Sequence, residues 1–254
     1  TNNTAHGNVT SSGGRVGGLI GAANLSSYNN SEPGYLYRCY ATGNVTGNNT
    51  VGGLIGYATT QTSPAVRECY ATGHVTATED QAGGLIGHIM GFSRALHATI
   101  RTSVEDCYAT GDVTGGRYVG GLIGDAEGSV DITRCHSMGK VSGNSEAGGS
   151  TGRFRRVIYT DIPEHINHYP QVTGYVFWNR TDNVGSSYGT KGSKTDAGKI
   201  ERKNAEEMGQ ICTYSGKGWR ISDSTTVTTG YLPSVSAYPV LSCQEGGPNG
   251  GFGT

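Results

Sequence analysis

The chain has 254 residues, a formal net charge of −1, 43 glycines and only 15% charged residues. A nearly neutral chain has no field that would attract nucleic acid or an anionic membrane, so we expect neither partner. No apolar run reaches the roughly 20 residues of a membrane-spanning helix, so we expect no membrane insertion. Glycine and β-branched residues disfavour helix, and the composition predicts an all-β protein with one short helix at residues 203–211.

Two short signatures recur along the first part of the chain. The first is Gly-x-Val-Thr, or Gly-x-Val-Ser in its last copy. The second is Gly-Gly-Leu-Ile-Gly, whose last copy is Gly-Gly-Ser-Thr-Gly. A cysteine followed by Tyr or His closes each unit. From the leucine of the second signature to the next cysteine there are 20, 15, 22 and 13 residues, so all length variation enters at one place. The first signature starts at Gly7, Gly43, Gly73, Gly111 and Gly139, and the second at Gly17, Gly52, Gly83, Gly120 and Gly148.

A repeat of this length with one variable corner predicts a solenoid of stacked short strands. Propeller blades of about 40 to 50 residues and leucine-rich repeats of about 20 to 29 residues fit less well. Within "CYATGNVT", strand alternation turns Cys39, Ala41 and Val45 inward and the residues between them outward. The glycines that flank the Leu-Ile pair of "VGGLIG" are expected to provide positive φ or tight backbone approach at coil corners.

Stacking at about 4.7 to 4.9 Å would align equivalent inward residues in columns. Buried free thiols are the main interpretation of the cysteine column, and disulfides between Cys39 and Cys69 or between Cys107 and Cys135 are the alternative. The two predicted columns are Cys39, Cys69, Cys107 and Cys135, and Leu19, Leu54, Leu85 and Leu122.

"GGLIG" followed by a cysteine strand and "YATGNVTG" resembles the GLUG motif over about residues 5–152. That motif occurs as tandem repeats in secreted or surface proteins, including filamentous-haemagglutinin-like adhesins and non-catalytic regions of IgA-specific metalloproteases. The resemblance implies a right-handed parallel β-solenoid, here of about five coils, and an extracellular or cell-surface location. It implies no activity for the repeats.

The composition changes after residue 152, where basic and aromatic residues follow the repeats. We expect residues 1–152 to form the solenoid and residues 153–254 to form a mixed, mainly β capping or assembly region that includes the short helix. Cys212 and Cys243 lie in this second region, and a disulfide between them would fit an extracellular protein. The first coil is expected to present an incomplete edge, which a strand from another molecule would complete.

Motifs for catalysis or cofactor binding are missing from the sequence. The glycine pairs lack the Gly-Lys-Ser/Thr of a phosphate loop, and the cysteines lack the Cys-x-x-Cys spacing of many metal sites. His165 and His168 beside Glu164 do not form HExxH, and there is no nucleophile elbow. We therefore predict no catalytic, cofactor-binding or metal-binding residue, and a non-enzymatic protein. An outward column of Asn8, Asn44, His74, Asp112 and Lys140 is too irregular and too charged for a flat ice-binding face.

Two sets of residues are candidates for modification or contact. Sequons in predicted loops or turns, together with one late sequon, are candidate glycosylation sites: Asn24, Asn29, Asn48 and Asn179. Variable loops at residues 22–38, 57–68 and 88–106 would offer a one-sided contact surface. Their candidate contact residues are Tyr28, Tyr35, Tyr37, Phe92 and Arg94.

These features predict an extracellular structural or adhesive solenoid, either a self-assembling, pilus-like fibre subunit or an adhesin stalk. Its partners would be copies of itself, added head to tail, or a cell-surface or carbohydrate ligand, and no cofactor is expected. The alternative is a carbohydrate-binding or carbohydrate-active solenoid with its site beside the loops that follow "GGLIG". Clustered carboxylates or a metal at those loops would favour the alternative.

Overall fold

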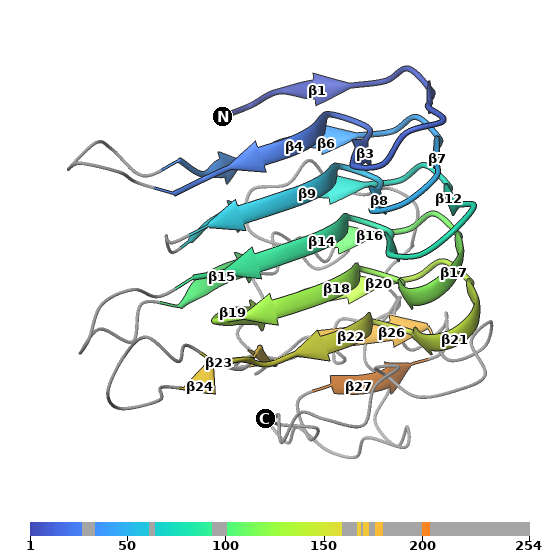
Figure 1. Cartoon of the computed structure of the whole chain (residues 1–254). Helices are drawn as coiled ribbons and strands as arrows, with labels where there is room; N and C mark the ends of the chain where they lie inside the picture. The colour runs from blue at the N-terminus through green and yellow to red at the C-terminus, as the bar shows by residue number, and fades with distance from the viewer. Residues whose placement is uncertain are drawn as a thin grey trace, which may run out of the picture.

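The computed structural model describes residues 1–26, 34–60, 64–92, 101–158, 167–168, 170–172, 176–179 and 200–203. Every regular element in these ranges is a β-strand, and most strands lie in parallel sheets (Figure 1). This part of the chain contains no helix long and apolar enough to span a membrane. The predicted all-β class with parallel strands is therefore confirmed for the described residues.

The chain passes through four parallel sheets in turn, and we call one such passage a coil. Sheet A consists of β1 (Thr4–Ala5), β6 (Tyr40–Ala41), β11 (Tyr70–Ala71), β16 (Tyr108–Ala109), β20 (Cys135–Ser137), β26 (Val176–Asn179) and β27 (Ile200–Lys203). Sheet B consists of β2 (Val9–Thr10), β3 (Val16–Gly17), β7 (Val45–Gly47), β8 (Val51–Gly52), β12 (Val75–Ala77), β13 (Ala82–Gly83), β17 (Val113–Gly120) and β21 (Val141–Gly148).

The other two sheets complete each coil. Sheet C consists of β4 (Ile20–Asn24), β9 (Ile55–Thr60), β14 (Ile86–Gly91), β18 (Ile123–Gly128) and β22 (Thr151–Arg155), which lie one below another in Figure 1. Sheet D consists of β5 (Leu36–Tyr37), β10 (Val66–Arg67), β15 (Thr102–Glu105), β19 (Val130–Thr133) and β25 (Gln171–Val172). A separate antiparallel pair joins β23 (Val157–Ile158) to β24 (Asn167–His168).

Successive coils stack in register, so each position of the repeat forms a column. Val45 pairs with Val9 on one side and with Val75 on the other. The predicted alternation is confirmed, because Cys39 and Ala41 are 1% exposed whereas Asn44 faces solvent. In-register stacking thus converts a sequence repeat into continuous internal columns.

The cysteine and leucine columns are both present in the core. The four cysteines are buried free thiols, and the leucines from Leu54 onward are fully buried. Each thiol donates a hydrogen bond to the carbonyl oxygen two residues earlier, for example Cys107 to Glu105 at 3.0 Å and Cys69 to Arg67 at 3.2 Å. The cysteine therefore satisfies a carbonyl group at the corner where the coil turns.

The coils turn at two columns of non-glycine residues with positive φ. In the described residues only Gly128 among the glycines has a positive φ, so the expectation that the signature glycines supply this conformation is wrong. A left-handed conformation costs a non-glycine residue roughly 1 to 2 kcal/mol, and neighbouring coils must offset that cost. One column precedes the cysteines (Arg38, Glu68, Asp106 and Arg134, φ 49–54°), and the other precedes the Gly-Gly strands (Arg15, Thr50, Gln81, Tyr118 and Glu146, φ 49–60°).

Glycine is instead required where two coils approach closely. A Cβ added at Gly43 would lie 2.0 Å from the carbonyl oxygen of Gly7, and one added at Gly73 would lie 2.0 Å from that of Gly43. The same distance recurs at Gly111 and Gly139. At Gly7 itself an added Cβ meets nothing within 4 Å. At these glycines the coil on the N-terminal side sets the requirement. In the GGLIG signature, for which tight backbone approach is predicted, a Cβ added at Gly53 would lie 2.1 Å from the carbonyl oxygen of Gly84 in the next coil, so that prediction is confirmed.

The stacking continues past the repeats recognised in the sequence. β22 runs through the predicted boundary at residue 152, and β25, β26 and β27 extend sheets D and A. The boundary between residues 152 and 153 stays a prediction. Of the predicted helix at residues 203–211, only Lys203 is described, as the last residue of β27, and the remainder lies outside the described residues.

We predict that Gly73→Ala lowers the free energy of unfolding by about 3 kcal/mol, because the new methyl group would overlap the Gly43 carbonyl. The matched variant Gly7→Ala should change it by less than about 0.5 kcal/mol, because the space there is open. Urea denaturation of both variants measures the difference. Equal losses in the two variants would contradict the stacking geometry.

Candidate functional site

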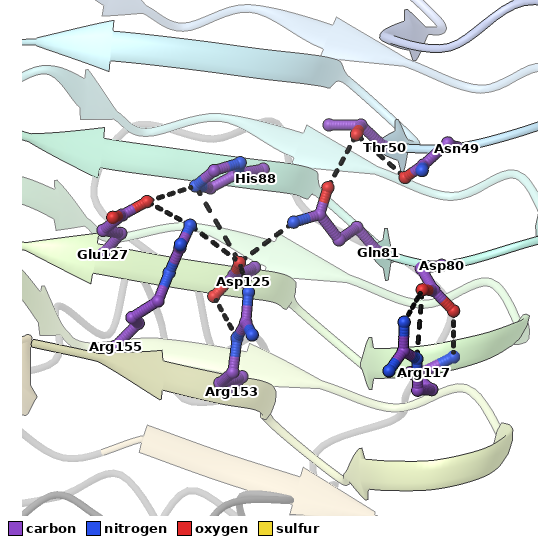
Figure 2. A network of polar contacts seen from close by, with 10 residues as sticks. All are labelled: Asn49, Thr50, Asp80, Gln81, His88, Arg117, Asp125, Glu127, Arg153 and Arg155. Atoms are coloured by element: carbon purple, nitrogen blue, oxygen red, sulfur yellow. Dashed lines mark hydrogen bonds and ion pairs between the residues drawn. The ribbon is translucent and has the colours of Figure 1, made fainter.

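A cluster of charged side chains lies on the outer face of sheet C, directly after the GGLIG signature (Figure 2). Strand register places His88 beside Asp125 and Asp125 beside Arg153. Two residues further along the same strands, Glu127 lies beside Arg155. Three neighbouring coils therefore bring these five residues to one face, as strand alternation requires.

Asp125 is the centre of the cluster and is fully buried. Arg153 forms a two-point contact with its carboxylate, in which Nε donates to Oδ1 at 3.0 Å and Nη2 contacts Oδ2. Gln81 Nε2 donates to Oδ2 at 3.0 Å, and Arg155 Nη2 lies 3.6 Å from the same oxygen. A two-point arginine contact with further donors is the arrangement that stabilises a buried carboxylate.

Glu127 forms the second half of the cluster. His88 Nε2 lies 3.1 Å from Glu127 Oε2, and Arg155 Nη2 contacts the same oxygen. The imidazole of His88 is buried and packs edge-on against the ring of Tyr57 at 5.1 Å. Both carboxylates thus face cations or hydrogen-bond donors.

Aromatic and amide groups connect the cluster to the column of positive-φ residues that precedes the Gly-Gly strands. The Arg153 guanidinium lies 3.5 Å from the centre of the Tyr118 ring, and the Arg15 guanidinium lies 4.5 Å from that of Tyr57. Thr50 Oγ1 donates to Gln81 Oε1 at 2.7 Å. Within the described ranges, no group of three or more His, Cys, Asp or Glu residues is arranged to hold a metal ion. The chemistry supported by this geometry is mutual stabilisation of buried charges.

A second ion-pair column follows the corner that precedes the cysteines. Arg38 Nε lies 2.9 Å from Glu68 Oε2, and Arg134 Nε lies 2.6 Å from Asp106 Oδ1. Arg67 bridges the two acids at 3.5 Å and 3.8 Å, so the adjacent carboxylates of Glu68 and Asp106 share a cation. Hydrogen bonding to Asp106 raises the pKa of Arg134. These contacts help to offset the cost of the left-handed backbone at the same residues.

The irregular outward column forms a hydrogen-bonded ladder between side chains and backbone, which we call the acceptor ladder. The N–H of Asn44 donates to Asn8 Oδ1 at 2.8 Å, and the N–H of His74 donates to Asn44 Oδ1 at 2.9 Å. The N–H of Asp112 donates to His74 Nδ1 at 3.1 Å, and that of Lys140 donates to Asp112 Oδ1 at 2.8 Å. Each ladder residue except the last therefore supplies an acceptor to the next coil.

A third column stacks aromatic rings on the outer side of sheet A. The rings of Tyr40, Tyr70, Tyr108 and His136 lie 4.6, 4.8 and 5.1 Å apart, with planes within 5° of parallel. Burial raises the pKa of Tyr70 to about 12 and lowers that of His136 to about 3. Burial therefore favours the neutral form of both rings.

The predicted contact residues are only partly described. Tyr35 is 52% exposed, whereas Tyr37 is half-buried beneath the guanidinium of Arg38 at 4.8 Å. Phe92 is half-buried and directly follows β14. Tyr28 and Arg94 lie outside the described residues. The ranges predicted as loops also contain parts of sheets C and D, so the connections are shorter than expected.

The candidate modification sites differ in their surroundings. Asn24 is exposed, and its Oδ1 accepts a hydrogen bond from the N–H of Ser26 at 3.1 Å. Asn48 is half-buried, and its Oδ1 accepts one from the Thr78 hydroxyl at 2.6 Å. Asn179 ends β26. Asn29, Cys212 and Cys243 lie outside the described residues, as do His165 and Glu164.

Sequence reasoning missed the charge cluster, the corner ion pairs and the acceptor ladder. A signal was present for the corners, because the residue before each column cysteine is charged: Arg38, Glu68, Asp106 and Arg134. For the charge cluster, aligning the residues after "GGLIG" would have placed His88 beside Asp125. Both signals become visible only when the repeats are aligned so that equivalent positions of neighbouring coils stand side by side.

The chain is similar to one protein family and to one curated protein. The GLUG motif matches residues 47–76 and 80–114, two adjacent segments within the stacked coils. The chain is 41% identical over 194 residues to Halomucin from Haloquadratum walsbyi, an alignment that covers 68% of this chain. The chain spans about 2% of the length of that relative. No solved structure matches this chain significantly.

We predict that Arg153→Met lowers the free energy of unfolding by about 3 kcal/mol, because it leaves the buried Asp125 carboxylate with only part of its compensation. The control Arg117→Met breaks the pair with Asp80, which lies 2.8 Å from an exposed guanidinium, and should have little effect. Denaturant unfolding measures both changes. Similar losses would show that the cluster at Asp125 contributes no more than a surface ion pair.

We also predict that stability falls as the pH drops below about 6.5, in part because of His136. Burial lowers its pKa in the folded chain to about 3, below the ordinary histidine value of about 6.5, so the unfolded chain binds the proton first as the pH falls. The contribution is therefore complete above 6.5 and decreases toward pH 3, by at most about 1.4 kcal/mol per pH unit. Comparing unfolding of the native chain and His136→Phe from pH 4 to 8 isolates this effect. Parallel pH profiles would contradict it.

Proposed function

The chain is a GLUG-motif repeat protein, and we propose that it serves outside the cell as a non-enzymatic structural or adhesive rod at a cell surface. The observation that carries the proposal is the in-register stacking of one repeat per coil through four parallel sheets. Its relative is named Halomucin, and the mucin in that name supports an extracellular surface setting. We further propose that about five coils form a right-handed solenoid, because parallel crossover connections nearly always take that hand.

The proposed mechanical role rests on how the coils hold each other. Backbone hydrogen bonds join every coil to the next, and equivalent Val, Leu, Ile and Cys side chains fill one continuous interior. Contacts in such a stack are made between neighbours, so stiffness grows by repetition. The ion-pair clusters lie at corners and on an outer face, where they support adjacent coils without opening the core.

Adhesion would use the connections between sheets C and D. Length variation enters the repeat between β4 and β5, β9 and β10, β14 and β15, and β18 and β19. Connections at one corner of every coil are suited to one-sided contact, because a rigid scaffold positions loops of different length. Tyr35, which is 52% exposed in the first of these connections, is the described residue we propose as a contact. The ligand we propose is a cell-surface or carbohydrate group.

A carbohydrate-active site is the second candidate, because Asp125 and Glu127 lie on one face directly after the GGLIG signature. Arginines contact both carboxylates, which favours a structural role over proton transfer. Head-to-tail self-assembly into a fibre is the other form of the structural proposal, because head-to-tail contacts that do not close into a ring generate open filaments.

Negative-stain electron microscopy of the purified protein, with binding to a panel of immobilised glycans, tests the proposal. We expect glycan binding that Tyr35→Ala weakens several-fold while Arg117→Met leaves it unchanged. Filaments in the micrographs would support the fibre form of the proposal, because five coils at about 4.8 Å make a single copy only about 24 Å tall. Absence of filaments together with absence of binding to every glycan would contradict the proposal. Hydrolysis of a glycan that Asp125→Asn abolishes without unfolding the chain would establish the carbohydrate-active alternative.

A further inference from the structure

We infer that Asn44 of the acceptor ladder is a site of N-linked glycosylation, with the glycan attached to its side-chain nitrogen Nδ2. Asn44, Val45 and Thr46 form the Asn-x-Thr sequence that such a glycan requires. The sequence alone favours sequons in loops, whereas Asn44 directly precedes strand β7. This assignment rests on the extracellular setting of the proposed function, and it adds a covalent modification at a defined atom.

The acceptor ladder holds the side-chain amide of Asn44 in one orientation. The N–H of His74 donates to Asn44 Oδ1 at 2.9 Å. Because a backbone N–H only donates, the oxygen of this amide, and not its nitrogen, faces the next coil. Asn44 is exposed, and within the described part of the chain its Nδ2 has no hydrogen-bond partner. The atom that would carry the glycan is therefore the one that the ladder leaves unused.

The threonine of the same sequon is also available. Strand alternation turns Val45 into the core, where it is fully buried, and places Asn44 and Thr46 on one outer face. Thr46 is half-buried, and among the described residues no group forms a hydrogen bond with its hydroxyl. The outward neighbours of Asn44 along the chain, Thr42 and Thr46, are small. Both reactive groups of the sequon are thus open to an enzyme.

The sequon at Asn48, four residues later, differs at both groups. Asn48 is half-buried, and its Oδ1 accepts a hydrogen bond from the Thr78 hydroxyl at 2.6 Å. The third residue of this sequon, Thr50, is buried, and its hydroxyl donates to Gln81 Oε1 at 2.7 Å. The folded chain therefore favours Asn44 over Asn48 as the acceptor of a glycan.

The modification transfers an oligosaccharide to Asn44 from a lipid-linked diphosphate donor. The bond between Nδ2 and C1 of the first sugar forms as the bond between C1 and the diphosphate oxygen breaks. The lipid diphosphate leaves with the electron pair and Nδ2 loses one proton, so nothing is oxidised or reduced. The product is still an amide, and its Oδ1 still accepts the N–H of His74. The ladder can therefore carry a glycan without losing a hydrogen bond.

The glycan would lie away from the connections proposed for adhesion. Asn44 lies at the corner between sheets A and B, whereas those connections leave sheet C at the ends of β4, β9, β14 and β18. In Figure 1, β7 is on the right and the sheet C strands run toward the left. The later ladder positions are occupied by His74, Asp112 and Lys140, which have no side-chain amide. Modification of the ladder is therefore confined to the coils of Asn8 and Asn44.

The test secretes the full chain carrying Asn8→Asp through an N-glycosylating eukaryotic secretory pathway. This substitution removes the neighbouring sequon and keeps a ladder acceptor, as Asp112 does for the N–H of Lys140 at 2.8 Å. Glycan release by peptide N-glycosidase in heavy-oxygen water converts each modified asparagine to labelled aspartate, which peptide mass spectrometry locates. We expect most molecules to be labelled at Asn44 and few at Asn48.

Matched variants separate the sequon from the ladder. Thr46→Ala should abolish the label at Asn44 while leaving its Oδ1 in place, and Thr46→Ser should retain the label. The melting temperature of the glycan-bearing chain should stay within about 1 °C of that of Thr46→Ala. Asn44→Ala removes the acceptor of the His74 N–H and should lower it by about 3 °C.

A secreted chain without label at Asn44 would overturn the inference, whether or not another sequon is labelled. So would a glycan-bearing chain that melts as low as Asn44→Ala, because attachment would then break the ladder. Filament formation and binding to immobilised glycans are separate readouts of the proposed function. Failure of those readouts would leave the label at Asn44 unchanged, so the two failures are distinguishable.

Discussion

The close approach of neighbouring backbones at one glycine per coil is the constraint on which the rest of the structure depends. With a carbonyl oxygen 2.0 Å from where a Cβ would lie, no other residue fits at Gly43, Gly73, Gly111 or Gly139. That contact fixes the register of each coil against the one before. Once register is fixed, every position of the repeat meets its own equivalent, and the molecule is organised as columns.

Stacking in columns brings charged side chains of neighbouring coils close together, and opposite charges at neighbouring positions compensate them. Identical charges in register would repel, so the corner column mixes arginine and acid, and Arg67 reaches in from the neighbouring position to join Glu68 and Asp106. On sheet C the same principle sets Asp125 against Arg153 and Glu127 against Arg155. The repeat can therefore vary on its outer side, provided that each coil complements its neighbour.

The sequence predicted the parallel stacking, the inward cysteine and leucine columns and the single variable corner, because these depend on spacing within one unit. It did not predict the left-handed corners, since Arg38 and Glu68 carry none of the glycine or asparagine signal that usually marks positive φ. The acceptor ladder could not be predicted from the sequence, because its residues differ in type and charge and share only a hydrogen-bonding role. The extension of sheet A by β26 and β27 was missed because those strands lack the repeat signatures.

Nuclear Overhauser contacts in solution between residues of successive coils test the central claim most directly. In-register parallel stacking predicts contacts linking Val45 to Val75 and Val75 to Val113, together with ring contacts from Tyr70 to Tyr108. A network dominated instead by antiparallel contacts between strands adjacent in sequence would contradict the stacked-coil structure, and with it the columns from which the function is proposed.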